Sequence, residues 1–390
     1  MKNSFIKPNP HVFPFMEFRD LSYKKIGMIS GKKVINMEDI KQIVEEANRN
    51  EDLINKIIHS LPKNQGIANQ IFYIFTHPLI RFGSLKMYQG NKDSWLKKFN
   101  TSIRNTRFAF SILGFPFKIP NPLKTNRTMP DLGEVMALNK LENIASLVEL
   151  VSGIRVEIYI ITEGAFGKFV GIKKNSTKQY QSRLGYLAKQ LDFTHLRFIP
   201  LEKMESYIKN FSQVFTNKVH LTEQLYQQND PETVKKIKEA YPTILRIINP
   251  KIDDLAILMD IYNFKVPDSK LSRGALKVRN YLKKQALKST IQYFCYLQFR
   301  DDVHFLEKEV GPTYIPLTVS PKPNRLGIIP LSSSVRILPH QGIPIYKPKT
   351  GIFKIMYLID LLRYNNQSSA MHLSGDQDQA PFYYEESSKS

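Results

Sequence analysis

The chain has 390 residues, of which 42% are hydrophobic and 23% are charged, an ordinary globular composition with room for a sizeable core. The 56 Lys and Arg residues outnumber the 35 Asp and Glu, and the net charge of +21 favours anionic partners such as phosphorylated metabolites, nucleic acid or acidic lipid headgroups. A single cysteine excludes an internal disulfide framework and any multi-cysteine metal site.

No apolar run approaches the roughly 18 residues of a membrane span. The first residues, "MKNSFIKPNPHVFPFMEF", lack the continuous apolar stretch of a secretory signal. The basic residues are scattered and follow no zinc-finger, leucine-zipper or RNA-recognition pattern, so nucleic acid is not an expected partner. We therefore expect a cytoplasmic protein, with secretion into a host cell without a cleaved signal as the alternative.

Residues 1–104 form a mostly helical lead-in in this interpretation. Apolar residues recur at helical spacing over 38–62, whereas "QIFYIFTHPLIRFGSLKMYQG" fits a helix or a strand equally well. Residues 106–113, "TRFAFSIL", are a short apolar strand candidate that continues directly into a loop.

That loop, "GFPFKIPNPLKTNRTMPDLGE" (114–134), carries Lys118 and Lys124 among four prolines. The prolines stiffen the loop and hold both lysines in place. Asp131 stands where a helix N-cap belongs, and Glu134 three residues later is its capping-box partner. Apolar residues then recur every three or four positions up to Gly153, which predicts a helix with one apolar face.

A second strand, "IRVEIYIITEG", a helix over about 177–191 and a third strand over 195–201 follow. This alternation predicts an α/β fold with a Rossmann-like, mostly parallel sheet and flanking helices. Ligands bind beyond the carboxyl ends of such strands. The Lys118 loop and Glu163 both follow strands, so we expect them at the same ligand-facing edge.

Residues 203–310 are predicted to be a largely helical insertion, with Cys295 as a core thiol. Strands are expected again in "YIPLTVSP", "RLGIIPL" and "GIPIYKP". The last segment, 365–390, has few residues to bury and is predicted to be a disordered tail. The predicted domains are thus 1–104, 105–364 and 365–390.

The loop and the helix start resemble the signature segment of the pyoverdine/dityrosine biosynthesis family, the isocyanide (isonitrile) synthases. That segment reads phenylalanine-proline-x-lysine, asparagine-proline-x-lysine, then proline-aspartate leading into a glutamate-bearing helix. The matching positions here are Phe115, Pro116, Lys118, Asn121, Pro122, Lys124, Pro130, Asp131, Glu134, Ala137, Leu138 and Leu141. The resemblance covers roughly residues 105–345, closely at the front and loosely at the back.

The later part of the chain departs from the family pattern. Glu163 replaces the aspartate of a serine-aspartate-glycine turn, and Pro316 and Ser320 stand where the family has an arginine and a histidine. The family's proline-tryptophan-histidine-glycine turn is echoed with the histidine moved one place, at His340 before Gln341.

The resemblance implies an enzyme that converts the amino group of an amino acid such as tyrosine or tryptophan into an isonitrile, with ribulose 5-phosphate as carbon donor and without a metal or other cofactor. It implies catalytic roles for Lys118, Glu163 and His340. A lysine can attract a phosphate or form an imine with a ketone, and carboxylates can shuttle protons. The residues expected to bind the substrates and the phosphate are Lys124, Asn121, Asp131, Glu134 and Arg325.

Other interpretations remain open. Lys118 and Lys124 are also explained as solvated loop lysines, Asp131 and Glu134 as a helix cap, and His340 as a surface histidine. A diverged relative would bind or hydrolyse a nucleotide or another phosphorylated ligand. A secreted bacterial effector that acts on a host partner is one form of this alternative. A catalytically inactive binding protein would use the basic surface for a macromolecular partner.

Overall fold

The computed structural model describes residues 32–386, apart from residues 120, 122, 249–257, 259–260, 263–265, 320–321, 323, 332–336, 349, 365–367, 377 and 379. None of the described helices has the length and hydropathy of a membrane-spanning segment.

The first of two five-stranded sheets contains the predicted α/β strands, and all its neighbouring strands are parallel. Strand β2 lies at its centre, and its residues are buried from Phe108 to Ile112 because the sheet is covered on both faces. The prediction of an α/β fold with a parallel sheet is confirmed. In spatial order the strands are β4 (Leu196–Pro200), β3 (Val156–Thr162), β2 (Phe108–Gly114), β5 (Ile315–Thr318) and β6 (Leu326–Gly327).

Helix α6 (Leu132–Ser152) connects β2 to β3 and begins and ends where the sequence predicts. The Asp131 side chain accepts a hydrogen bond from the backbone N–H of Gly133, and the Glu134 side chain accepts one from the Asp131 N–H. Gly153 ends the helix with a φ of 65°, a left-handed conformation that glycine adopts without strain. Between β3 and β4 lie η2 (Gly164–Val170) and α7 (Lys174–Gln190).

The described part of the lead-in is helical, as predicted, after one short strand, β1 (Lys32–Ile35). The ambiguous stretch, residues 70–90, contains most of α3 and all of α4, and α3 packs against α5 and α6 with Phe75 fully buried. Residues 1–31 lie outside the described part of the chain. The lead-in helices are α1 (Met37–Glu51), α2 (Leu53–Ser60), α3 (Ile67–Thr76), α4 (Leu85–Gln89) and α5 (Lys92–Arg104).

The segment predicted as a helical insertion is helical wherever it is described beyond η3 (Leu201–Tyr207). Its longest helix, α11, packs against α8 and α9. The Cys295 side chain in α11 is fully buried and its thiol lies 3.2 Å from the Thr222 hydroxyl, so the predicted core thiol is confirmed. The elements are α8 (Phe211–Gln227), α9 (Pro231–Ile247), η4 (Asp268–Lys270), α11 (Arg273–Asp302) and α12 (Phe305–Glu309).

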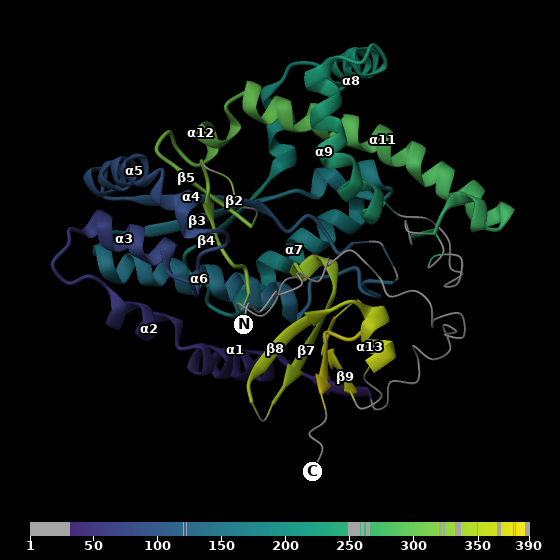
Figure 1. Ribbon diagram of the computed structural model, residues 1–390. Coiled ribbons are helices and arrows are strands. Elements are labelled where there is room, and N and C mark those ends of the chain that lie inside the picture. Colours follow the sequence, from purple (N-terminus) through teal and green to yellow (C-terminus); the bar gives the residue numbers. More distant parts are fainter. Residues whose placement is uncertain are drawn as a thin grey trace, which may run out of the picture.

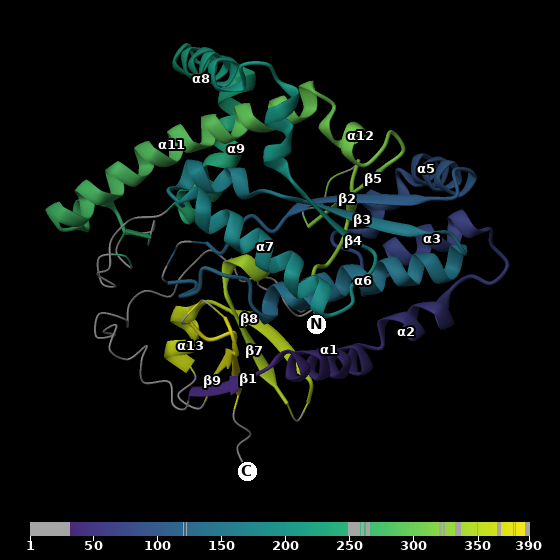
Figure 2. The same cartoon turned by 180° about the vertical axis from the view of Figure 1, so that it is seen from behind.

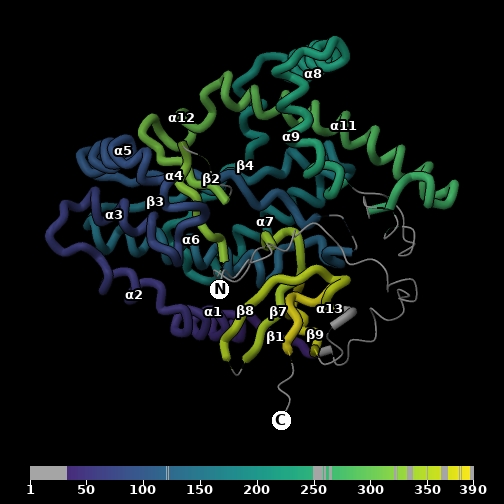
Figure 3. The backbone as a smooth tube through the Cα atoms, in the orientation of Figure 1, coloured from purple at the N-terminus to yellow at the C-terminus, as the bar shows by residue number. Residues whose placement is uncertain are grey.

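The second sheet joins both ends of the described chain. Its order is β1-β9-β10-β7-β8, so the first strand pairs in parallel with one near the C-terminus. In Figure 3 the purple end of the tube lies beside the yellow strands. The remaining elements of this part are η5 (Pro339–Gln341), β7 (Ile343–Lys347), β8 (Ile352–Met356), α13 (Leu358–Tyr364), β9 (Ser368–Leu373) and β10 (Tyr383–Glu386).

The expectation of a disordered tail from residue 365 is corrected by this sheet. Strands β9 and β10 occupy its second and third positions and pair with each other in antiparallel fashion. Phe382, Tyr383 and Tyr384 are at most 2% exposed. Composition misled the prediction because these three aromatic residues, together with backbone pairing on both sides, are sufficient to dock an otherwise polar segment.

The two sheets lie on opposite sides of α6 and α7. Figures 1 and 2 show α8, α9 and α11 at one end of the molecule and the second sheet at the other, with the parallel sheet and α6 between them. The loop that follows β2 therefore emerges between the parallel sheet and the second sheet. The domain boundaries at residues 105 and 365 stay a prediction.

Candidate functional site

Backbone hydrogen bonds hold the loop after β2 against two distant segments. The Ile119 N–H donates to the carbonyl of His340 in η5 over 3.0 Å. Beyond β8, the Leu358 N–H donates to the Lys124 carbonyl over 2.9 Å and the Ile359 N–H to the Leu123 carbonyl over 3.0 Å. The second sheet thus fixes the loop at the carboxyl edge of the parallel sheet.

Lys118 is the centre of a buried charged cluster. Its Nζ lies 2.6 Å from Asp131 Oδ2 and 2.9 Å from Glu134 Oε2, and all three side chains are fully inaccessible to solvent. The ammonium also donates to the carbonyl oxygen of Pro339 at 2.9 Å. The alternative of a solvated Lys118 is therefore wrong, and the capping pair of α6 also neutralises a buried cation.

The two carboxyl groups of the cluster hold their protons differently. Burial raises the pKa of Asp131 well above its usual value, and the attraction of Lys118 only partly offsets this. Burial also opposes ionisation of Glu134, but Lys118 and the hydrogen bonds of Asp131 outweigh it and lower the pKa of Glu134. The Tyr180 hydroxyl of α7 donates to Glu134 Oε1 at 3.1 Å. The cluster thus places two carboxyl groups of unequal proton affinity side by side, an arrangement that suits proton transfer.

His340 borders this cluster. Burial lowers the pKa of its imidazole to about 4; the charge of Glu134 opposes that shift, and those of Lys118 and Lys124 reinforce it. The ring is therefore neutral at pH 7 and can accept a proton. Gln341 Nε2 lies 3.5 Å from His340 Nε2. The predicted residues Lys118, Lys124, Asp131, Glu134 and His340 are thus brought together by the fold.

Lys124 differs from Lys118 because no counter-ion for it is found in the described part of the chain. Its side chain is only 3% exposed, and no hydrogen bond or ion pair of its ammonium is found among the described residues. Nζ lies 5.1 Å from the centre of the Tyr357 ring. Burial, with a contribution from Arg246, lowers the pKa of Lys124 to about 8. This lysine is therefore close to losing its proton at neutral pH.

Asn121 has a structural position inside the loop. Its Oδ1 accepts from the Leu123 N–H at 3.0 Å, and its Nδ2 donates to the Arg246 carbonyl at 3.4 Å. Both ends of the amide are thus used to shape the loop and to join it to α9, and its predicted contact with substrate remains untested.

Glu163 lies at the same edge as the Lys118 loop, as predicted. Gly114 at the end of β2 pairs with Thr162 at the end of β3, and the Glu163 N–H donates to the Gly114 carbonyl at 3.4 Å. Tyr293 of α11 donates a hydrogen bond to the Glu163 carboxylate. Burial raises the pKa of Glu163, against the effects of Tyr293 and two arginines, Arg300 and Arg325.

Arg325 belongs to a second group of charges beside Glu163. Burial and the neighbouring Arg300 lower the pKa of Arg325, and both arginines together with burial lower the pKa of Lys322. Three cations that repel one another therefore gather near the connection from β5 to β6. Pro316, one of the departures from the family pattern, lies in β5 opposite Ser111 of β2, and Ser320 lies outside the described residues.

Sequence reasoning missed several residues of this region. Arg127 is 3% exposed, forms an ion pair with Asp376 and donates to the Ala380 carbonyl at 2.7 Å. Asp376 and Ala380 lie about 250 positions further along the chain, so no local sequence pattern indicates these two contacts. Tyr293 and Arg300 lie in the long helix α11. Residues that face the core and residues that face the site recur there at the same helical spacing, so the sequence does not distinguish them.

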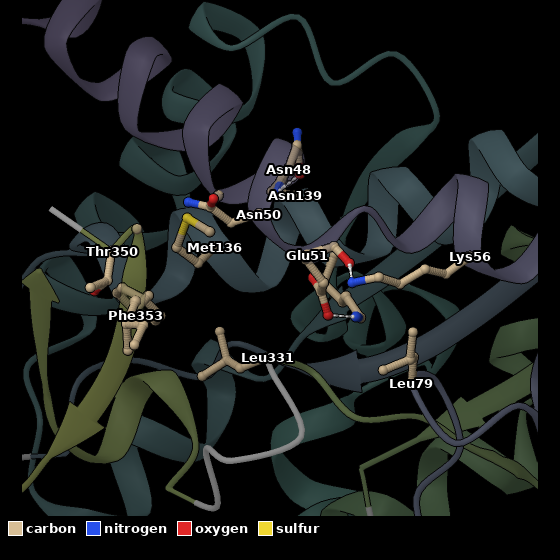
Figure 4. Close-up of a pocket in the computed structure, with 14 residues that line it drawn as sticks. Asn48, Asn50, Glu51, Lys56, Leu79, Met136, Asn139, Leu331, Thr350 and Phe353 are labelled. Carbon is tan, nitrogen blue, oxygen red and sulfur yellow. Dashed lines mark hydrogen bonds and ion pairs between the residues drawn. The ribbon is translucent and has the colours of Figure 1, made fainter. Parts of the chain in front are cut away.

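A cavity of about 470 Å³ lies elsewhere, between the end of α1, the middle of α6 and the β7–β8 turn (Figure 4). Polar and apolar residues line it together, among them Asn139, Lys140 and Phe353. None of the eight predicted site residues lines this cavity. Among the described residues, no group of three His, Cys, Asp or Glu side chains is arranged to hold a metal ion.

Replacing Lys124 with methionine is expected to stabilise the protein at neutral pH, by up to about 3 kcal/mol. The folded pKa of about 8 lies below the ordinary lysine value of 10.5. The unfolded wild type therefore binds more protons between these pH values, and the stability of the wild type rises with pH. The advantage of the variant should be full below pH 8 and disappear by about pH 10.5. Denaturant titrations at both ends of this range measure it, and a variant that is less stable throughout would reveal a stabilising partner of the ammonium.

Comparisons with known proteins agree with the resemblance. Residues 100–285 match the family model described as pyoverdine/dityrosine biosynthesis protein. The chain is 25% identical over 178 residues to an L-tyrosine isonitrile synthase of Xenorhabdus nematophila, which covers 45% of this chain and 49% of the relative. It is 27% identical over 99 residues to the L-tyrosine isonitrile synthase of Pseudomonas aeruginosa, covering 25% of this chain and 30% of that protein.

An isocyanide synthase of Aspergillus fumigatus is 32% identical over 89 residues, which cover 22% of this chain and 12% of the relative. The matches thus span half or less of the curated relatives' length. The crystal structure of the PvcA protein from Pseudomonas aeruginosa has the same fold, with a TM-score of 0.62 over 83% of this chain and 100% of that one, at 18% identity. Residues 100–285, a little under half of this chain, therefore match the pyoverdine/dityrosine biosynthesis family.

Proposed function

We propose that this chain is an isonitrile synthase that converts the amino group of an amino acid, such as tyrosine or tryptophan, into an isonitrile with ribulose 5-phosphate as carbon donor. The observation that carries the proposal is the buried cluster of Lys118, Asp131 and Glu134, all three from the family segment, with the half-buried His340 beside it. The names of the relatives, two of them L-tyrosine isonitrile synthases, support the same activity.

In this proposal the cluster moves protons between nitrogen and carbon. The neutral His340 imidazole accepts a proton, and the unequal carboxyl groups of Asp131 and Glu134 hold and return one. Lys118 acts as a fixed positive charge that keeps Glu134 ionised. Glu163, whose raised pKa suits an acid–base group, is proposed to transfer protons from its position after β3 at the same edge of the sheet.

Arg325 is proposed to bind the phosphate of the carbon donor. The charge of Arg300 lowers the pKa of Arg325, and the charges of both arginines lower the pKa of Lys322, so the three cations lie near one another. A phosphate between three such cations would relieve their repulsion and form charge-assisted hydrogen bonds. These cations would take over the task of the arginine and histidine that the family pattern has at Pro316 and Ser320.

The same three cations favour a second candidate function, the binding or hydrolysis of a nucleotide by a diverged relative. Their charges recognise a phosphate whatever is attached to it. Magnesium-dependent release of phosphate from ATP, with no product from amino acid and sugar phosphate, would favour this second function.

The proposed activity predicts a new isonitrile carbon when the purified protein is given tyrosine or tryptophan and uniformly ¹³C-labelled ribulose 5-phosphate. Carbon NMR identifies the product. His340→Gln and Glu163→Gln are each expected to lower the rate by about 10²–10⁴, the range for loss of an acid–base group. Lys98→Ala, in which a lysine is removed from α5, serves as a control and should keep the wild-type rate. No labelled isonitrile from any of the common amino acids would refute the proposal.

A further inference from the structure

The two lysines of the loop have opposite surroundings. The acceptors around Lys118 Nζ are fixed: two carboxyl groups within 2.9 Å, the Pro339 carbonyl at 2.9 Å and the Gly342 carbonyl at 3.4 Å. An ammonium has three N–H donors, so these contacts use all of them. Lys118 has no lone pair and no free donor to offer a substrate.

Lys124, six residues later, is fixed by hydrogen bonds at its backbone, whereas its ammonium has no hydrogen bond or ion pair to any described residue. The hydrogen bonds from Leu358 and Ile359 fix the backbone of this part of the loop. The Tyr357 ring lies beside the ammonium, and the nearby charge of Arg246 disfavours protonation. The Lys124 side chain is thus desolvated, and no carboxylate among the described residues stabilises its charged form.

Building on the proposed function, we infer that Lys124 is a nucleophilic amine that captures the ketone of the phosphosugar donor as an imine, while Lys118 is a structural charge. A nucleophilic lysine needs a desolvated position near other cations and a base within reach. Lys124 is desolvated, with 3% exposure, and Arg246 is the neighbouring cation. His340 is the base, and it is near enough for the charge of Lys124 to lower its pKa.

The step balances without an oxidant or a reductant. Lys124 passes its extra proton to a base such as His340, and its lone pair attacks the ketone carbon to form a C–N bond. The carbonyl π bond breaks, its oxygen takes up a proton, and the resulting carbinolamine loses water to give the imine. The amino group of the amino acid then displaces Lys124 by transimination, which transfers the sugar carbon to that nitrogen and releases Lys124 unchanged.

The charge state of Lys124 supports this role. With a pKa of about 8, roughly one molecule in ten carries the neutral amine at pH 7, whereas an ordinary lysine with a pKa of 10.5 is neutral in fewer than one in a thousand. The amine is therefore available at neutral pH.

The test is reductive trapping on the full-length protein. Ribulose 5-phosphate and sodium cyanoborohydride are added without amino acid, and peptides are analysed by mass spectrometry. The peptide that contains Lys124 should gain the mass of the sugar phosphate less one oxygen atom, and the yield should rise with pH through about 8. Ribitol 5-phosphate, which has the phosphate but no carbonyl, should give no adduct.

A matched control lysine lies in α5. Lys98 also stands over an aromatic ring, 4.9 Å from the centre of Trp95, and burial likewise lowers the pKa of its ammonium. Lys124→Arg keeps the positive charge and should abolish the adduct, whereas Lys98→Arg should leave it unchanged. An adduct that persists in Lys124→Arg, or that forms equally on Lys98, overturns the inference.

The trapping result and the activity assay separate the two proposals. Isonitrile formation by a wild type that yields no adduct at Lys124 overturns the role of Lys124 and leaves the proposed function standing. An adduct at Lys124 without isonitrile from any amino acid supports carbonyl capture and refutes the synthase activity.

Discussion

Methionine in place of Lys118 is expected to lower the free energy of unfolding by about 3–5 kcal/mol, the range for removing one partner of a buried ion pair. The substitution leaves Glu134 ionised and fully buried without its cation, beside the Asp131 carboxyl group. It also removes a donor from the Pro339 carbonyl. Urea denaturation at neutral pH, followed by circular dichroism, measures the loss.

Lys124→Met is the matched control for this prediction, because it makes the same exchange in the same loop. The two substitutions should act in opposite directions at neutral pH, Lys118→Met destabilising and Lys124→Met stabilising. Adding Glu134→Gln to Lys118→Met removes the unpaired charge and should recover part of the loss, as a double-mutant cycle will quantify. A loss within about 0.5 kcal/mol, typical of exposed sites, would contradict the buried cluster.

Ending the chain after Tyr364 is expected to cost about 5 kcal/mol or more, which would remove most of a typical domain's stability. The deletion removes the second and third strands of a five-stranded sheet and leaves β1 without its partner. It also removes the three buried aromatic residues at 382–384 and the Asp376 carboxylate that pairs with buried Arg127.

Thermal melting measures this effect, and the melting temperature should fall by far more than about 5 °C, or cooperative melting should be lost altogether. A chain that ends after Glu386 keeps every described contact of the segment and serves as the control. If the chain ending after Tyr364 melted within about 5 °C of the full-length protein, the second sheet could not hold the loop in the way described.

The elements of the parallel sheet could be predicted because their causes are local. Alternating apolar residues in β3, and the Asp131 and Glu134 capping pair with Gly153 at the far end of α6, are all readable within about 20 positions. The placement of Glu163 and the Lys118 loop at one edge followed from the predicted alternation of strands and helices, because both follow strands of a parallel sheet.

The difference between Lys118 and Lys124 could not be predicted, because it comes from distant parts of the chain. Both lysines follow a proline-bracketed pattern, yet η5 supplies a carbonyl to Lys118 while α9 and the segment after β8 supply an arginine and a tyrosine ring to Lys124. The tail was missed for a related reason. Asp376 and Asp378 look like solvated acids until they are seen binding Arg127 and the Thr128 N–H.

The order of the second sheet has a consequence for synthesis on the ribosome. Strand β1 emerges early, but its neighbour β9 is translated only after almost all of the described chain. Asp376 and Asp378, which hold residues 127–129 of the loop, are made later still. The nascent chain can form its parallel sheet well before the loop is anchored, so a polypeptide interrupted in its last stretch would leave the ribosome with a formed core and an unassembled candidate site.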